Sequence, residues 1–111
     1  NPTMKKLLIA MLLASVASSA AAADINDSCK PVAAGIVATS QAPDPEQFRN
    51  ELELVCNAGA TENISPADYQ TRLISFDSEI AAQQSPASRS IIEGLKSAYM
   101  AGHEIDQNAL R

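Results

Sequence analysis

The sequence has little of what most enzymes and metalloproteins use for their chemistry. Its 111 residues include one histidine, His103, two cysteines, Cys29 and Cys56, and no tryptophan. Nucleophilic catalysis needs a nucleophile beside a positioned base, which is most often histidine. A zinc site needs three or four convergent ligands. We therefore expect no metal centre and no nucleophilic enzyme, and we expect His103 to be structural or solvated.

The candidate residues for haem binding and for acid–base catalysis by carboxylates also lack the necessary spacing. A helical bundle holds haem through a C-x-x-C-H attachment or through axial ligands on opposite helices, whereas Met100 and His103 are close enough to share one helix. Asp77 and Glu79 are two residues apart, so on a helix they point to different sides. We expect these carboxylates to be solvated, and we expect no cofactor.

Only one long apolar run is present, and it lies near the start of the chain. Lys5 and Lys6 precede an apolar segment, 7–17, which is followed by small residues, 18–23. These are the features of a cleavable signal peptide, with an A-x-A site ending at Ala23. The apolar segment is shorter than the roughly 20 residues that span a bilayer. We predict a periplasmic or secreted protein whose mature form does not insert into a membrane.

The mature part is short and acidic. Residues 1–3 precede Met4 and are interpreted as a cloning remnant, so residues 1–23 are excluded and residues 24–111 are predicted to form a single domain. This part has six Lys and Arg against thirteen Asp and Glu, a formal charge of −7. Nucleic acid is a poor partner for such a surface, whereas a basic protein would be attracted.

The two cysteines predict one disulfide. An oxidising compartment favours the Cys29–Cys56 bond, which would stabilise the fold by roughly 3–4 kcal/mol in the chain-entropy model. The midpoint between the two residues falls in a predicted loop, 40–43. Two antiparallel helices joined there would bring residues equidistant from the turn together, so the disulfide would join the first two helices of an αα-hairpin.

Three helix starts follow from the pairs Asp44-Pro45, Ser65-Pro66 and Ser85-Pro86. In each, the first residue can cap a helix and the proline occupies the first helical position. An earlier helix is predicted over about 28–39, with Pro31 in its first turn. No segment alternates as a strand does. The sequence therefore predicts an all-α fold, a small antiparallel bundle of about four helices.

Each predicted helix carries one apolar stripe at helical spacing. The stripes comprise Cys29, Val32, Ala33 and Ile36; Phe48, Leu52, Val55 and Cys56; Tyr69, Leu73, Phe76 and Ile80; and Ile91, Leu95, Ala98 and Gly102, flanked by Ile92 and Tyr99. Gly94 and Gly102 would permit close contact between helices. Gly102 could instead end the last helix.

Three apolar residues fall off these stripes: Leu54, Ile74 and Met100. They are our candidates for a protein-binding surface, because together they would form an apolar patch rimmed by acidic residues. The alternative is that they pack against a second neighbouring helix inside the bundle.

In size, export signal and single disulfide the chain resembles the helical periplasmic acid-stress chaperones and the small helical immunity proteins of type VI secretion. Neither resemblance includes a motif, so no residue is carried over. We expect a non-enzymatic protein-binding protein, such as an inhibitor, an immunity factor or a secretion accessory, with a homodimer as a further option. The alternative is an acid-stress or general periplasmic chaperone. A small-molecule-binding bundle and an enzyme that uses carboxylates alone are further alternatives.

Overall fold

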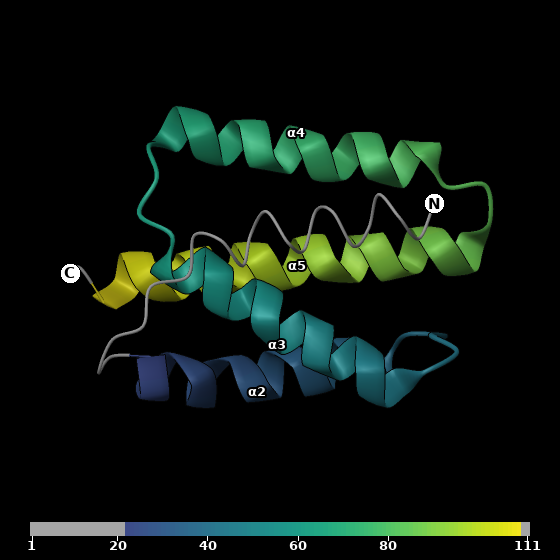
Figure 1. The fold of residues 1–111 in the computed structure, drawn as a ribbon, viewed down its shortest axis with the longest axis horizontal. Helices are drawn as coiled ribbons and strands as arrows, with labels where there is room; N and C mark the ends of the chain where they lie inside the picture. Colours follow the sequence, from purple (N-terminus) through teal and green to yellow (C-terminus); the bar gives the residue numbers. More distant parts are fainter. Residues whose placement is uncertain (1–21, 110–111) are drawn as a thin grey trace.

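The computed structural model describes residues 22–109, and within them the chain forms four helices and no strand (Figure 1). The helices are α2 (Ala22–Ala38), α3 (Pro45–Thr61), α4 (Pro66–Ala82) and α5 (Pro86–Ala109). Successive helices run in opposite directions, as expected when short loops join them. The predicted all-α antiparallel bundle is confirmed. The predicted signal segment up to residue 21 lies outside the described residues.

The last three helices begin at the three predicted prolines. The side-chain oxygens of Asp44, Ser65 and Ser85 each accept a hydrogen bond, 3.1 Å long, from the backbone N–H three residues further on. Each cap satisfies one of the amide donors that the first turn of a helix leaves without a partner. These boundaries depend on residues adjacent in sequence, which is why the sequence predicts them correctly.

The first helix is longer than predicted. It begins at Ala22 rather than near residue 28, so Pro31 lies inside the helix and not in its first turn. An interior proline removes one helical hydrogen bond. The residues before it are nevertheless attached to the rest of the fold, because Ile25 packs against the core and Asn26 Oδ1 accepts a hydrogen bond of 2.7 Å from Asn57 Nδ2 on α3. Tertiary contacts therefore override the local signal.

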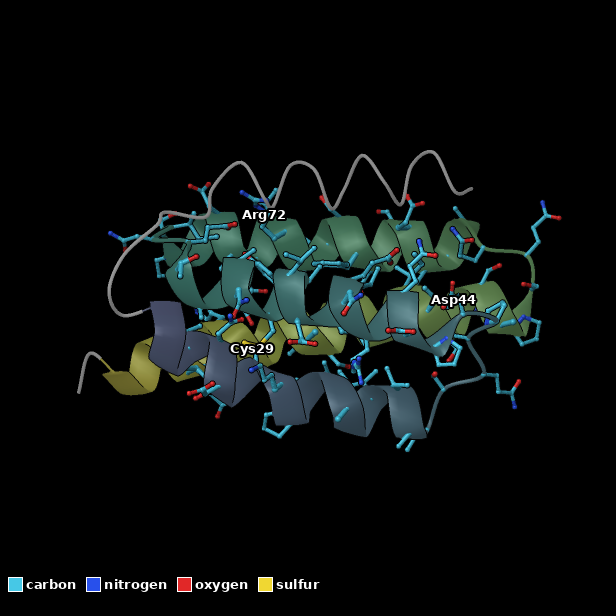
Figure 2. The ribbon with its side chains drawn as sticks, turned by 60° about the horizontal axis from the view of Figure 1, so that its bottom comes forward. Cys29, Asp44 and Arg72 are labelled. Carbon is cyan, nitrogen blue, oxygen red and sulfur yellow. A yellow bond between two sulfur atoms is a disulfide. The ribbon has the colours of Figure 1, made fainter. Side chains whose placement is uncertain are left out.

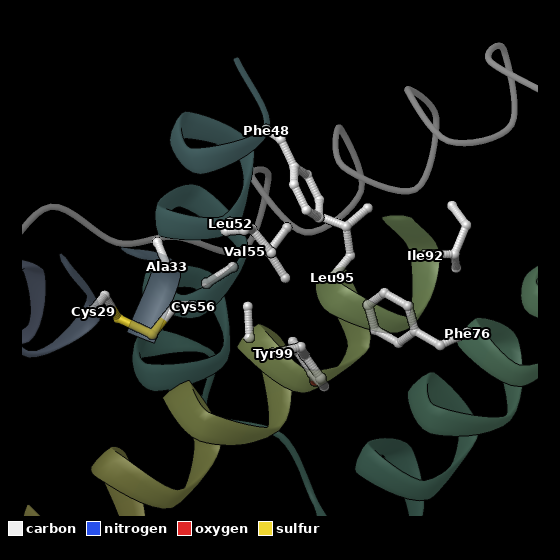
Figure 3. Close-up of a cluster of buried hydrophobic side chains, with 12 residues drawn as sticks. Cys29, Ala33, Phe48, Leu52, Val55, Cys56, Phe76, Ile92, Leu95 and Tyr99 are labelled. Carbon is white, nitrogen blue, oxygen red and sulfur yellow. A yellow bond between two sulfur atoms is a disulfide. The ribbon is translucent and has the colours of Figure 1, made fainter. Parts of the chain in front are cut away.

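The disulfide joins α2 to α3 as predicted. Cys29 and Cys56 are bonded, with their Cα atoms 5.8 Å apart, and both side chains are fully buried (Figure 3). Around them lies the core, in which every predicted stripe contributes buried or half-buried residues. The fully or nearly fully buried members are Cys29, Ala33, Phe48, Leu52, Val55, Cys56, Ala58, Phe76, Ile92, Leu95, Ala98 and Tyr99.

The closest contact between helices is the crossing of α3 and α5, which pack against each other more extensively than any other pair. Gly59 on α3 faces the backbone carbonyl of Tyr99, and Gly102 on α5 faces the backbone carbonyl of Cys56. A Cβ atom at either glycine would overlap that carbonyl oxygen. The two backbones can approach this closely only because neither residue carries a side chain.

This crossing also settles where the last helix ends. Helix α5 continues through Gly102 to Ala109, and no glycine among the described residues has a positive φ. Gly102 is therefore an interior helical residue that permits close packing, and it does not end the helix. Gly94 has a similar role, since a Cβ there would lie 2.8 Å from the Phe48 ring and 3.0 Å from Ile36 Cγ2.

Helix α4 is attached on one side only. It packs mainly against α5, whereas α2, α3 and α5 all pack against one another. Only two of its residues, Phe76 and Glu79, are buried. Figure 1 shows α4 on the far side of α5 from α2. The fold is thus a three-helix body with a fourth helix laid on α5.

Two glycine substitutions test the importance of the crossing. Gly102→Ala should lower the free energy of unfolding by about 1–3 kcal/mol or more, because α3 and α5 must move apart to admit the methyl group. Gly35→Ala is the matched control. It places the same methyl group on an exposed part of α2 with no atom within 4 Å, and should stabilise the protein by roughly 0.5–1 kcal/mol. Denaturant unfolding measures both, and equal effects would contradict the assignment.

Candidate functional site

A buried polar cluster joins three helices near the end of α3. Glu62, the residue that follows α3, accepts a hydrogen bond of 2.9 Å at Oε1 from the Tyr99 hydroxyl on α5. The same oxygen lies 3.2 Å from Arg72 Nη2 on α4, and Arg72 is labelled in Figure 2. The Glu62 side chain is only 2% exposed. A buried carboxylate must be paired and hydrogen-bonded, and here each of two other helices supplies one partner.

Aromatic rings extend this cluster along the interface of α4 and α5. The Tyr69 ring of α4 stacks on the His103 imidazole, with 3.7 Å between centroids and 15° between planes. Tyr69 also stacks on Tyr99, at 5.7 Å. Phe76 meets Tyr99 at 5.5 Å and points from α4 toward α5 in Figure 3. His103 thus forms part of a packed interface, which agrees with the structural role expected for it.

Burial and charge keep both tyrosines protonated. Burial, followed by the hydrogen bond and the charge of Glu62, holds the pKa of Tyr99 far above its usual range, with Arg72 opposing in part. Burial also raises the pKa of Tyr69, Glu104 raises it further, and Lys96 opposes. Tyr99 is therefore a donor to Glu62 at any physiological pH. The cluster provides hydrogen bonds and an ion pair rather than a nucleophile.

The paired carboxylates of α4 differ from the sequence-based expectation in one respect. Asp77 is exposed and its Oδ1 lies 2.6 Å from Lys96 Nζ on α5. Glu79 does point to a different side, but it is buried at 8% exposure rather than solvated. Its Oε1 accepts a hydrogen bond of 3.4 Å from Gln83 Nε2. The expectation of solvated carboxylates is thus wrong for Glu79, because the residue lies beside Phe76 and Ile80 on the inner side of α4.

Sequence reasoning did not find the cluster of Glu62, Arg72 and Tyr99. These residues come from three separate segments, and their pairing depends on how α4 lies on α5. The spacing predicts only that Tyr99 flanks the apolar stripe of the last helix, whereas in the structure its hydroxyl donates a hydrogen bond to Glu62. A buried aromatic with a polar end normally requires a partner, which is the one signal that points toward the cluster.

The three predicted binding residues are all exposed. Leu54 on α3 is 41% exposed, Ile74 on α4 is 62% exposed and Met100 on α5 is 41% exposed. They are the exposed large hydrophobic residues of the described chain, but Leu54 and Met100 are each covered in part by the bundle. Each comes from a different helix, and their role in binding stays a prediction.

Two open pockets lie near the loop between α2 and α3. The larger, about 280 Å³, is lined by Ala42, Pro43, Asp44, Gln47, Phe48, Glu51 and Ile91. Asp44, labelled in Figure 2, uses a carboxylate oxygen to cap α3. The smaller, about 210 Å³, lies between the end of α2 and α5. Neither pocket includes a predicted site residue.

Among the described residues there is no group of three or more His, Cys, Asp or Glu side chains that could hold a metal ion. No helix within 22–109 is long and apolar enough to cross a membrane. Comparisons with protein-family models, with curated proteins and with solved structures found no match to this chain. Function is therefore inferred from the side chains themselves.

The two tyrosines give a direct test of the polar cluster. In denaturant both should ionise near pH 10, whereas in the folded protein both pKa values are raised. The neutral form is favoured by folding, so this stability is present below about pH 10 and is lost as the pH rises toward the folded pKa. Absorbance of tyrosinate in folded and unfolded protein measures the difference. Ordinary midpoints for both tyrosines in the folded state would contradict the cluster.

Tyr99→Phe separates the contribution of the hydroxyl. It should lower the free energy of unfolding by about 1–3 kcal/mol at pH 7, because a buried carboxylate loses a donor. The substitution should also remove most of the decrease in the free energy of unfolding that the wild-type protein shows above about pH 10. Tyr69→Phe is the control, because the partners of Glu62 Oε1 are the Tyr99 hydroxyl and Arg72.

Proposed function

We propose that this is an exported, non-enzymatic protein that binds another protein through the outward side of α4. The observation that carries the proposal is the 62% exposure of Ile74, a large aliphatic side chain near the middle of that helix. Scattered exposed apolar residues are ordinary on protein surfaces. Ile74 differs because of its surroundings.

Most of the residues around Ile74 on the outward side of α4 are small and uncharged. At about 100° per residue its nearest neighbours are Ala67, Gln70, Thr71, Asp77, Ser78 and Ala81, all of which are exposed. The Thr71 hydroxyl donates to the carbonyl of Ala67 at 3.1 Å, so it is already partnered within the helix. A partner could therefore approach the helix closely and cover Ile74 with little loss of hydration.

Charge indicates the kind of partner. Asp77 lies beside Ile74 and Asp68 lies further round α4, both exposed. The predicted mature chain has a formal charge of −7. A partner with basic residues around an apolar contact would match it. Leu54 and Met100 lie on other helices and are tested as separate positions.

The cysteines and the histidine, which are the most reactive side chains of this chain, already take part in structural contacts. This supports a binding role over a catalytic one. Cys29 and Cys56 are bonded to each other, and the imidazole of His103 is stacked on Tyr69. The disulfide is compatible with an oxidising, extracytoplasmic compartment. It also makes the three-helix body a firm support for α4.

A second function, suppression of the aggregation of other proteins in acid, is favoured by one specific observation. Both ion pairs that join α4 to its neighbours use a carboxylate, Glu62 in one and Asp77 in the other. Both attachments therefore depend on a charged carboxylate. A client protein that aggregates at pH 3 would be protected there and not at pH 7 if this function holds.

Aspartate substitutions test the proposed binding surface. Ile74→Asp should change the free energy of unfolding by no more than about 0.5 kcal/mol, because the site is exposed. It should abolish capture of the partner from periplasmic extract, or dissociate a homodimer measured by sedimentation. Leu54→Asp and Met100→Asp report whether the surface extends to α3 and α5. Ala34→Asp, which adds the same charge on the exposed side of α2, should behave as wild type.

Two results would count against the proposal. One is a loss of several kcal/mol in Ile74→Asp, which would make Ile74 part of the core. The other is undiminished binding in this variant at unchanged stability, which would place the interface elsewhere.

A further inference from the structure

We infer that the larger pocket, beside the loop between α2 and α3, binds a small organic cation in which an ammonium group is carried on a short apolar chain. The lining of this pocket comes from that loop, from α3 and from α5, so the pocket is separate from Ile74 on the outward side of α4. Binding here adds a small-molecule ligand to the proposed function and does not depend on it.

One side of the pocket is apolar and preformed. Phe48, which is 3% exposed, and Ile91, which is half-buried, both pack in the core and line the pocket. The Phe48 ring is held against the backbone of α5, where a Cβ at Gly94 would lie 2.8 Å from it. Ala42 and Pro43 of the loop complete this side. An apolar group that enters the pocket therefore meets a surface that is already in place.

The size of the pocket limits the ligand. Its volume of about 280 Å³ lies just below the range of about 300–1,000 Å³ that is usual for drug-sized ligands. A short alkyl chain with one polar group suits this volume better than a large ring system does.

The other side of the pocket is acidic and ordered by one residue. Asp44, Gln47 and Glu51 lie at helical spacing, so they share one side of α3 with Phe48. The backbone N–H of Gln47 donates to Asp44 Oδ1 at 3.1 Å, and its side-chain Nε2 donates to Glu51 Oε1 at 3.3 Å. Gln47 thus orients both carboxylates beside the apolar surface.

The charge of the pocket favours a cation. Its lining carries the two carboxylates and no basic residue. The first turn of α3 opposes them with a positive potential equivalent to about half a charge, which is smaller than the charge of the two carboxylates. Arg49, the nearest basic residue along α3, is paired with Glu53, which is not part of the lining. An anion would therefore be repelled.

The apolar side favours an organic cation over an inorganic one. A bare inorganic cation would leave Phe48 and Ile91 in contact with water, whereas an alkyl chain would cover them. Each methylene group that leaves water should raise the affinity up to about fourfold. The pocket therefore matches an ammonium group next to the carboxylates, with its alkyl chain on the aromatic ring and the isoleucine.

Titration of the wild-type protein with n-pentylammonium chloride at constant ionic strength tests this site, with backbone amide shifts followed by two-dimensional NMR. The shifts should saturate, and the largest should fall within residues 42–51 and around Ile91. Methylammonium should bind at least about tenfold more weakly, because it lacks four methylene groups. The neutral 1-pentanol should also bind at least about tenfold more weakly, because it lacks the charge.

Three charge-removing variants locate the binding site. Asp44→Asn and Glu51→Gln should each weaken the binding of n-pentylammonium at least about fivefold. Asparagine caps a helix as well as aspartate does, and the glutamine at position 51 keeps an oxygen that can accept from Gln47, so the fold should be preserved. Glu46→Gln is the matched control, because it removes the same charge from an exposed position of α3 outside the lining. Its affinity should be close to that of wild type.

The outcomes separate a site from general attraction. Weakening by Asp44→Asn and Glu51→Gln alone supports the proposal. Equal weakening in all three variants would mean that the overall charge attracts the ligand, which overturns it. Equally tight binding of 1-pentanol, or no saturable shift at the pocket of the wild-type protein, also overturns it. Ile74→Asp should bind n-pentylammonium as wild type does, so failure at this pocket and failure of binding at Ile74 are distinguishable.

Discussion

The close approach of α3 and α5 is the contact on which the rest of the structure depends. Gly59 and Gly102 each meet a backbone carbonyl of the opposite helix, and this fixes both the separation and the register of the two helices. The register places the Tyr99 hydroxyl on Glu62 at the end of α3. Cys56, whose carbonyl meets Gly102, also carries the disulfide to α2. A wider crossing would lose the hydrogen bond between Tyr99 and Glu62.

The two sides of this pair are stabilised in different ways. On one side, α2 is attached by a covalent bond and by packing of small and aliphatic residues such as Ala33. On the other, α4 is attached by stacked aromatic rings and by two ion pairs. The pair of Asp77 with Lys96 is partly exposed, and such pairs contribute little stability, whereas the pair of Arg72 with Glu62 is largely buried. The molecule therefore combines a disulfide-linked body with a helix attached through ring stacking and polar contacts.

The sequence predicts those features that depend on residues close together along the chain. The starts at Pro45, Pro66 and Pro86 follow from the caps that precede them. The disulfide and the antiparallel hairpin follow from the position of Cys29 and Cys56 about a single loop. Leu54, Ile74 and Met100 lie off the predicted apolar stripes, and in the structure all three are exposed.

Other features depend on contacts between distant segments, and the sequence does not predict them correctly. The start of α2 at Ala22, with an interior Pro31, is supported by packing against α3. A glycine at position 102 is compatible with the end of a helix and with a close crossing of two helices. Only the facing carbonyl of Cys56 shows that Gly102 permits the crossing. The pairing of Glu62 with Arg72 and Tyr99 requires three segments at once. Periodicity describes one helix at a time and cannot reveal such a cluster.

Because α4 packs mainly against α5 and buries only two residues, we expect it to open independently of the body formed by α2, α3 and α5. Native-state hydrogen exchange of the wild-type protein at pH 7, resolved by helix and repeated at low denaturant concentrations, tests it most directly. The account predicts that amides in the middle of α4 exchange through an opening of much lower free energy than those around Gly59 and Gly102. Equal protection in α4 and α3, with the same dependence on denaturant, would show that all four helices open together and would contradict it.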